Sequence, residues 1–294
     1  MFEDENNGFS HLIEKELNST DKILKPDFSQ KAGREFLAFY LQSKFKQVLA
    51  YDAKTPEPIF KEVSYDFIQK FSKRLITNPE KKIMIGITGE SASGKTTICR
   101  TISSATTLYN MPVTILTTDN YFNDISDLIK KYGSFDALRD NGYDVDSPES
   151  FQLDILKEDL EKISHGEDIY SPEYLPNGTG VSVPKSRFVP SNKIVVVEGM
   201  ASMYKDIKDI FDIKVYIETD IDVRKDWFMK RAYTERNQDP ENALKHWEYI
   251  QIAGQKYVQP AREEADIIIN GKANLAYFRQ ILQYMHTITN NFNS

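Results

Sequence analysis

Residues 82–100, with the sequence KIMIGITGESASGKTTICR, constrain the fold of this chain more than any other stretch. They begin with a short apolar run that ends at a glycine, which is typical of a buried parallel strand. Residues 89–96, GESASGKT, then match the phosphate-binding loop pattern G-x-x-x-x-G-K-S/T. Residues 97–102 read as the start of a helix. Because a strand, a glycine-bounded loop and a helix follow in this order, the stretch predicts a phosphate-binding loop within an α/β fold.

The residue types of this loop suit an anion. The two glycines allow backbone angles that other residues resist, and the small side chains between them let backbone N–H groups turn inward. The helix that begins near Lys95 adds the positive end of its dipole. We expect Lys95 to bridge the β- and γ-phosphates of a nucleotide and Thr96 to offer its hydroxyl to Mg²⁺. The predicted nucleotide-binding residues are Gly89, Glu90, Ser91, Ala92, Ser93, Gly94, Lys95, Thr96 and Thr97. The alternative is a glycine-rich turn that matches by chance, which the flanking strand and helix disfavour.

Composition and charge narrow the class of protein. The 294 residues are 40% hydrophobic and 28% charged, which is ordinary for a globular protein. The net charge of −7 argues against a dedicated nucleic-acid surface. The single cysteine, Cys99, cannot form an intrachain disulfide, and we interpret it as a buried core residue. The first residues lack the apolar region of a signal peptide, and no run approaches 18 apolar residues, so we expect a cytoplasmic protein without a membrane segment.

Further along the chain, short apolar runs alternate with helical patterns. The predicted strands cover residues 113–118, 193–199, 213–218 and 266–270, and the predicted helices cover 149–163, 220–236, 240–258 and 275–289. Together with the strand before the loop, this alternation predicts a five-stranded, mainly parallel sheet flanked by helices. Residues 123–147 read as a polar, irregular segment, and residues 169–187 as a loop or hairpin.

The chain before the phosphate loop has a different pattern. Two stretches, 30–50 and 59–76, carry apolar residues at helical spacing and are separated by prolines. They contain no strand signal. We therefore predict an N-terminal helical extension over residues 1–80 and an α/β domain over residues 81–294, with the aromatic stripe of the second helix packed against that domain.

Two acidic residues follow predicted strands. Asp119 comes directly after the second strand, and Glu198 ends the third. Ligands of open α/β sheets bind at the carboxyl ends of the strands, so both acids are candidate site residues. A helix cap or turn residue is the alternative for Asp119. His165 lies beside a glycine at a predicted helix end, and we interpret it as a C-terminal cap.

A basic cluster occupies the helix predicted over residues 220–236. Two readings are open for it. The cluster is either a solvated charged face, since acidic residues are interspersed, or an arginine lid over the transferring phosphoryl group. Its members are Arg224, Lys225, Lys230, Arg231 and Arg236.

The order of the motifs resembles the uridine kinase and phosphoribulokinase family of P-loop kinases, over about residues 82–290. GESASGKT is similar to the family's phosphate loop, and residues 119–122, DNYF, to its Asp-Ser-Phe-Tyr after the second strand. Residues 145–151, VDSPESF, are similar to its Phe-Asp-His-Pro-Asp-Ala-Phe, and residues 172–174, PEY, to its Pro-x-Tyr. Residues 197–200 and 264–268 resemble its Glu-Gly-Ile and Tyr-Ala-Asp-Val-Ile motifs.

This resemblance implies an ATP-dependent kinase that uses ATP and Mg²⁺ and a small-molecule hydroxyl acceptor. It implies that Asp119 is the catalytic base, acting with Lys95, and that Glu198 lies near Mg²⁺ together with Thr96. Arg231 and Arg236 match part of the family's lid over the phosphates. The acceptor-binding residues implied are Asp119, Tyr121, Asp146 and Tyr174.

Several positions depart from the family pattern. Ser147 replaces the histidine of the His-Pro step, Leu175 replaces an aspartate, and Trp227 and Phe228 stand where paired arginines are usual. A nucleoside such as uridine is the leading acceptor, and a sugar phosphate, pantothenate or glycerate is the alternative. A nucleotide-dependent switch is disfavoured because the chain has no guanine-reading Asn-Lys-x-Asp motif. An inactive regulatory homologue is the third reading, and the sequence leaves a homo-oligomer open.

Overall fold

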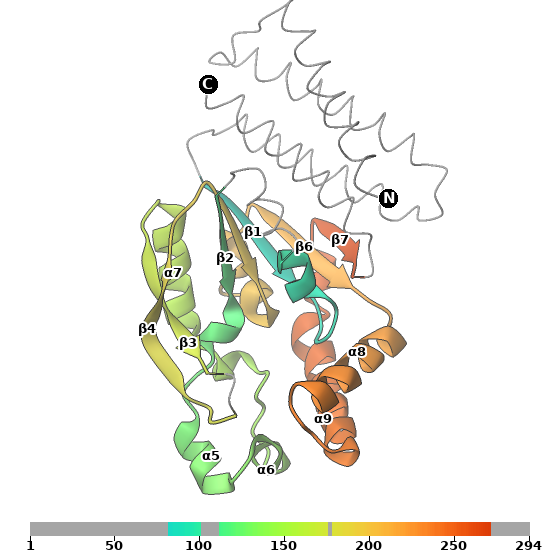
Figure 1. Ribbon diagram of the computed structural model, residues 1–294. Coiled ribbons are helices and arrows are strands. Elements are labelled where there is room, and N and C mark those ends of the chain that lie inside the picture. Colours follow the sequence, from blue (N-terminus) through green and yellow to red (C-terminus); the bar gives the residue numbers. More distant parts are fainter. Residues whose placement is uncertain (1–81, 101–111, 176–177, 272–294) are drawn as a thin grey trace, which may run out of the picture.

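The computed structural model describes residues 82–100, 112–175 and 178–271 (Figure 1). Three sequence predictions lie outside the described residues: the N-terminal helical extension over 1–80, the helix over 275–289, and the end of the helix that follows the phosphate loop. The domain division therefore stays a prediction.

The described chain forms the predicted five-stranded sheet. Its strands, in spatial order, are β2, β5, β1, β6 and β7, and every neighbouring pair is parallel. β1 lies at the centre and is buried along its whole length, which explains its continuous apolar sequence. The strand bounds are β1 Ile83–Thr88, β2 Val113–Thr117, β5 Ile194–Glu198, β6 Ile213–Glu218 and β7 Ile267–Asn270.

Strand register brings the carboxyl ends of the sheet level with one another. Thr117 of β2 and Ile87 of β1 both pair with Glu198 of β5. The phosphate loop after β1, the turn after β2 and the end of β5 therefore meet at one edge. In Figure 1 the strand arrowheads point toward this edge, beyond which α8 and α9 lie.

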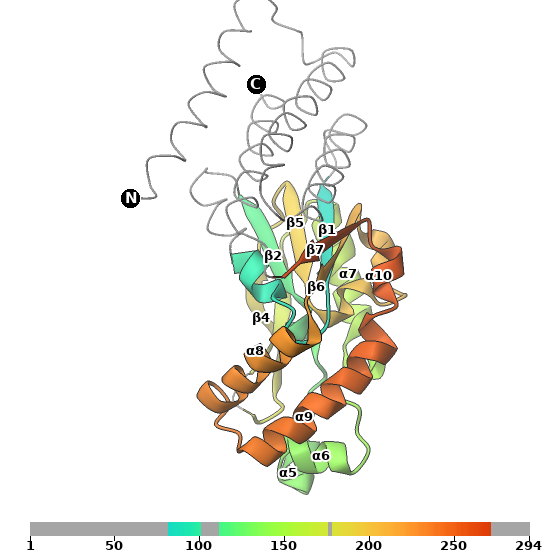
Figure 2. The same ribbon diagram turned by 90° about the vertical axis from the view of Figure 1, so that its right-hand side faces the viewer.

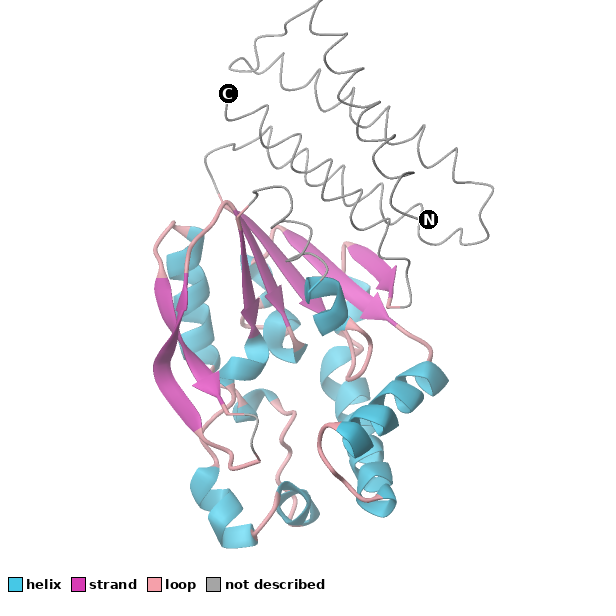
Figure 3. Cartoon of the chain, in the orientation of Figure 1, coloured by secondary structure: helices cyan, strands magenta, loops and turns pink. Residues whose placement is uncertain are grey.

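Helices cover both faces of the sheet and extend past its carboxyl edge (Figures 1 and 3). Short 3₁₀ turns occupy residues 118–121, 148–150, 200–203 and 208–210, and a π-helical turn, Gly254–Val258, follows α9. The helix bounds are α5 Ser126–Tyr132, α6 Phe135–Asp140, α7 Leu153–Ser164, α8 Ile221–Thr234, α9 Pro240–Ala253 and α10 Ala261–Glu264. Figure 2 shows α8 and α9 side by side, with α5 and α6 beneath α9, and α6 contacts α9 through His246 and Tyr249.

Two helices lie where the sequence suggested an irregular segment. α5 ends at Gly133, which adopts φ +89°, and α6 begins at Ser134, whose hydroxyl accepts a hydrogen bond from the Ala137 N–H at 3.1 Å. Each helix is only six or seven residues long, too short for a helical period to stand out. The prediction of irregular structure was wrong here.

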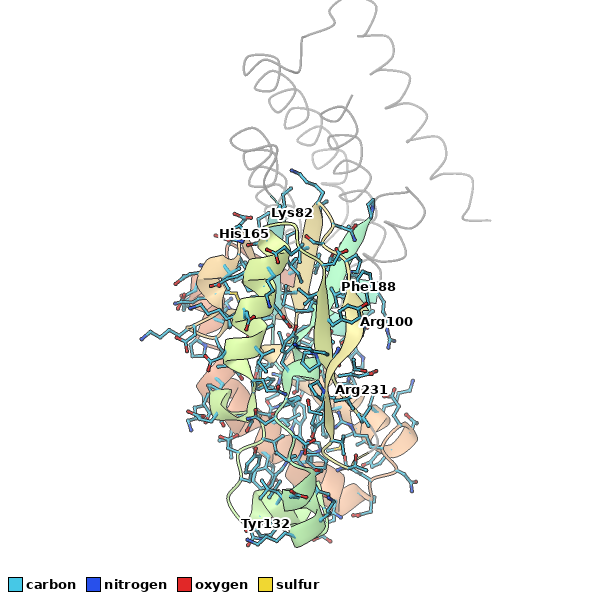
Figure 4. All side chains as sticks on the ribbon, turned by 90° about the vertical axis from the view of Figure 1, so that its left-hand side faces the viewer. Lys82, Arg100, Tyr132, His165, Phe188 and Arg231 are labelled. Carbon is cyan, nitrogen blue, oxygen red and sulfur yellow. The ribbon has the colours of Figure 1, made fainter. Side chains whose placement is uncertain are left out.

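A separate antiparallel hairpin stands beside α7. It consists of β3, Ile169–Tyr174, and β4, Ser182–Val189. The sequence prediction of a loop or hairpin is resolved in favour of the hairpin. Figures 3 and 4 show it packed along α7, and Figure 4 shows His165 at the end of that helix. The His165 Nδ1 lies 2.7 Å from the Glu161 carbonyl, which confirms the predicted cap.

The main core lies between the sheet and α7. Leu156, Leu160 and Ile163 recur at helical spacing on α7 and are fully buried against the strands. A smaller cluster holds α8 and α9 together, with Phe228 and Trp247 at its centre. Cys99 is buried, as predicted. Within the described ranges, no helix combines the length and apolar character needed to cross a bilayer.

Candidate active site

The phosphate loop joins β1 to a helix that begins at Lys95. Gly89 and Gly94 adopt φ values of +153° and +99°, and a Cβ on Gly89 would lie 2.5 Å from the Ile217 carbonyl oxygen. Both glycines are therefore required by the turn. The Lys95 Nζ donates to the Gly89 carbonyl at 2.6 Å and to the Glu90 carbonyl at 3.0 Å, so the ammonium group lies over its own loop.

Four charged side chains from three elements act on Lys95. Burial lowers the pKa of its ammonium group, the carboxylates of Glu198 and Asp119 raise that pKa, and the guanidinium groups of Arg231 and Arg224 lower it. The structure therefore brings the loop lysine together with both acids predicted from the strand ends, and with a predicted lid arginine.

Glu198 and Asp119 face this lysine from neighbouring strands. Glu198 is only 7% exposed, and its pKa is raised by burial and then by the charge of Asp119. Asp119 lies in the 3₁₀ turn after β2. Solvent reaches Asp119, yet the surrounding protein limits the hydration of its carboxylate, which raises the pKa, while Lys95, Arg236 and Arg231 lower it. Two acids with raised pKa values beside a lysine are typical of a functional site.

Mg²⁺ fits the oxygen donors at this edge. It prefers oxygen ligands, keeps several of its own waters, and is usually bound by one or two protein groups plus substrate phosphates. Thr96 is exposed on the first turn of the loop helix, and Glu198 and Asp119 repel each other across the site. No group of three or more His, Cys, Asp or Glu within the described residues could hold a metal by itself. The donor set therefore suits a cation that is held largely by a bound nucleotide.

Asp146 feels the charge of Asp119, and Tyr174 packs near Phe122, which follows Asp119 by three residues. Burial raises the pKa of Asp146 to about 6, with Arg139 opposing this shift and Asp144 and Asp119 adding to it. Tyr174 ends β3, and its ring lies 5.3 Å from that of Phe122. Burial raises the pKa of Tyr174 to about 12.

One predicted site residue differs from expectation. Tyr121 is fully buried, and its hydroxyl donates to Asp159 at 2.8 Å, so its side chain belongs to the core and cannot contact an acceptor. The Glu90 carboxylate, for which the sequence predicted no separate role, contacts α8. It forms an ion pair of 2.7 Å with Arg224, which leaves only the Glu90 backbone to the loop.

The basic cluster on α8 divides into two roles. Arg224 is 3% exposed, and its Nε donates to the Ser91 carbonyl at 3.1 Å. Arg224 therefore packs against the phosphate loop and holds its backbone. Arg231 and Arg236 act electrostatically on Asp119. The Arg236 guanidinium also lies 5.7 Å from the ring centroid of Phe228. The interpretation as a solvated face therefore fails for Arg224, and two arginines remain at the site.

One residue of the site could not be inferred from the sequence. Arg139 of α6 is half-buried, and its Nη1 lies 3.0 Å from the Asp136 carboxylate. Its Nη2 lies 3.0 Å from the His246 Nε2 of α9, and its charge acts on Asp146. The contact joins residues 107 positions apart, and no motif in the sequence marks it.

Comparison with known proteins is consistent with this geometry. Residues 84–275 match the model of the phosphoribulokinase/uridine kinase family. The chain is 31% identical over 196 residues to the uridine kinase of Deinococcus deserti, covering 66% of this chain and 90% of that protein. It is 28% identical over 216 residues to uridine-cytidine kinase-like 1 of Mus musculus, which covers 72% of this chain.

The chain spans about 38–43% of the length of three longer relatives, that mouse protein and uridine kinase-like proteins 5 and 3 of Arabidopsis thaliana. Among solved structures, the "putative fructose transport system kinase" of Silicibacter sp. TM1040 shares the fold with a TM-score of 0.56 and 16% identity, covering 68% of this chain and 96% of that one. The family match over more than half of the chain, carried by a phosphate loop beside two strand-end acids, shows that the chain belongs to the phosphoribulokinase/uridine kinase family.

Proposed function

We propose that this chain is an ATP-dependent kinase that transfers the γ-phosphoryl group to a hydroxyl of a small molecule, with a nucleoside as the leading acceptor. One observation carries the proposal. Lys95, Asp119 and Glu198 come from three different strand ends, and each shifts the pKa of another. Phosphoryl transfer depends mainly on positioning and charge neutralisation, and this arrangement supplies both.

Each side chain has a role in this proposal. The loop N–H groups and Lys95 hold the triphosphate, and Arg231 and Arg236 lie over it. Thr96 and Glu198 hold Mg²⁺, which when bound neutralises charge on the phosphates. Asp119 accepts the proton of the attacking hydroxyl, because its raised pKa brings the carboxylate closer to the pKa of an effective base.

The acceptor side supports a polyhydroxylated substrate. Asp146, on which the charge of Asp119 acts, and Tyr174, which packs near Phe122, remain from the acceptor motifs. In this proposal they hold vicinal hydroxyls and a ring. The relatives named as uridine kinases favour a nucleoside. The half-buried Arg139 beside Asp146 favours a second candidate, a hydroxylated acid such as a sugar phosphate or glycerate, because a guanidinium binds carboxylate or phosphate groups well.

The test is a phosphorylation screen with ATP and Mg²⁺ against a panel of nucleosides, sugar phosphates, pantothenate and glycerate. The proposal predicts ADP release that depends on one class of acceptor, with the phosphorylated acceptor detected by mass spectrometry. ATP binding without acceptor-dependent ADP release would favour the reading as a non-catalytic nucleotide-binding regulator. ADP release independent of any acceptor would favour a nucleotide switch.

A further inference from the structure

Trp227 lies on the face of α8 that meets the phosphate loop. Arg224 and Arg231, three positions before it and four after it, mark this face, because one bonds the loop from beneath and the other acts on Lys95. The Trp227 side chain is close to the loop itself. A Cβ built on Gly94 would lie 3.7 Å from the Cζ3 of Trp227. Figure 2 shows the first turns of α8 against the loop.

The backbone beside this indole includes two glycines. Gly94 is a glycine because of its φ of +99°, and the position of its absent Cβ lies 3.2 Å from the Gly271 carbonyl oxygen. Gly271 directly follows β7, and a Cβ there would collide with the Ser93 carbonyl oxygen and the Thr219 hydroxyl. Two glycines from distant parts of the chain therefore meet beside the ring of Trp227, and neither of them adds a side chain there.

Trp227 is not needed for the core of the helix pair. Its neighbour Phe228 is 3% exposed and packs with Trp247 in the cluster between α8 and α9. Trp227 remains 36% exposed. An indole left partly in water costs free energy, which a flat ligand would recover by covering the ring.

We propose that Trp227 stacks on the base of the nucleotide whose phosphates occupy the loop. This inference rests on the proposed function and deepens it. A nucleotide held by its phosphates between Gly94 and Thr96 has its base tethered within a few bonds of the loop, and Trp227 is the exposed aromatic ring adjacent to Gly94 in the described structure. Every base presents a π-face, so stacking on an indole tolerates different bases. The protein should therefore accept GTP as well as ATP as a phosphoryl donor.

The experiment measures the binding of three ligands by titration calorimetry: ATP, GTP and inorganic tripolyphosphate, which carries no base. Trp227→Ala should weaken ATP and GTP binding about 5- to 140-fold, as expected for a stacking energy of about 1–3 kcal/mol at 1.4 kcal/mol per tenfold. Tripolyphosphate binding should not change. Trp227→Phe should restore most of the ATP affinity. Tyr233→Ala is the matched control, because Tyr233 is a 46% exposed aromatic on the same helix, and it should bind all three ligands as the wild type does.

Fluorescence gives a second readout in the wild-type protein. The chain has two tryptophans, and Trp247 is 5% exposed. ATP should change the emission of Trp227, and this change should be absent from Trp227→Ala and absent with tripolyphosphate.

Two results would overturn the inference while leaving the kinase proposal standing. In one, Trp227→Ala binds ATP as tightly as the wild type. In the other, it loses affinity for ATP and tripolyphosphate equally while unfolding at the wild-type temperature, which would mean that Trp227 shapes the loop and touches no base. Failure of the wild-type protein to bind either ATP or tripolyphosphate would overturn the inference and the proposed function together.

Discussion

Replacing Arg224 by methionine should destabilise the protein strongly, although the residue belongs to a helix and sits next to solvated charges. The Arg224 Nη1 lies 2.7 Å from the Glu90 carboxylate, and the two side chains are 3% and 12% exposed. Arg224 also donates to the Ser91 carbonyl, and its guanidinium lies 5.6 Å from the ring centroid of Trp247. Arg→Met keeps most of the apolar stem and removes the charged guanidinium together with its hydrogen bond to Ser91.

The expected loss in the free energy of unfolding depends on the charge of Glu90, which stays buried after Arg224 is replaced. Removing one partner of a buried ion pair costs about 3–5 kcal/mol, because the other charge stays buried without compensation. Glu90 keeps a weak contact of 3.4 Å with the Gln259 amide and a little exposure, so we expect the lower end, about 3 kcal/mol. For a domain of this size that corresponds to a fall in the unfolding temperature of roughly 6–12 °C.

The assay is thermal and urea unfolding of three variants: Arg224→Met, Glu90→Gln, and the two combined. The double variant should be more stable than Arg224→Met alone, because no charged group then stays buried without a partner next to the loop. Two results would refute the reasoning that this pair is effectively buried. One is a fall in the free energy of unfolding of less than about 1 kcal/mol in Arg224→Met. The other is a double variant that is no more stable than Arg224→Met.

Four further predictions concern the site. Catalytic efficiency toward the acceptor should fall as the pH drops through about 6, because a protonated Asp146 can no longer accept hydrogen bonds from two acceptor hydroxyls; a flat pH profile between 5 and 8 would contradict this. The same raised pKa means that the ionised Asp146 weakens the folded state above pH 6, so Asp146→Asn should raise the unfolding temperature at pH 8 and give no gain below about pH 4, near the carboxyl pKa of the unfolded chain. Lys95→Ala should abolish ADP release with little change in unfolding temperature, and near-normal turnover in a folded variant would remove the phosphate-loop assignment. Among nucleosides, 2′-deoxy forms should be poor acceptors while uridine and cytidine behave alike, since Ser147 stands where the family has a histidine; strong base discrimination with 2′-deoxy forms accepted equally would oppose that view.

Much of the framework was predictable because its determinants are local. The phosphate loop is specified by glycines and a lysine within eight residues, and the sheet follows from apolar runs alternating with helical periods. The strand ends then place Asp119 and Glu198 at the loop, because parallel strands share a carboxyl edge. None of these inferences needs a contact between distant residues.

The differences arise where a distant partner decides the role of a side chain. Tyr121 belongs to a motif at the edge of the site, yet its hydroxyl donates a hydrogen bond to Asp159 on α7 and its side chain is buried in the core. Glu90 lies within the phosphate-loop motif, yet its carboxylate forms an ion pair with Arg224 on α8. Helical spacing puts Arg224 and Arg231, seven positions apart, on one face of α8. It could not tell which of them would be buried, because that depends on the loop packed against the helix.

The proton-accepting role of Asp119 is the central claim, and Asp119→Asn tests it most directly. The measurement is the rate of ADP release at saturating acceptor, together with the ATP affinity of the same variant. The account predicts a rate about 10²- to 10⁴-fold lower, the usual contribution of a positioned general base, with ATP affinity nearly unchanged. A collapse of ATP affinity with a high residual rate would contradict it, since Asp119 would then be a metal ligand and not the base.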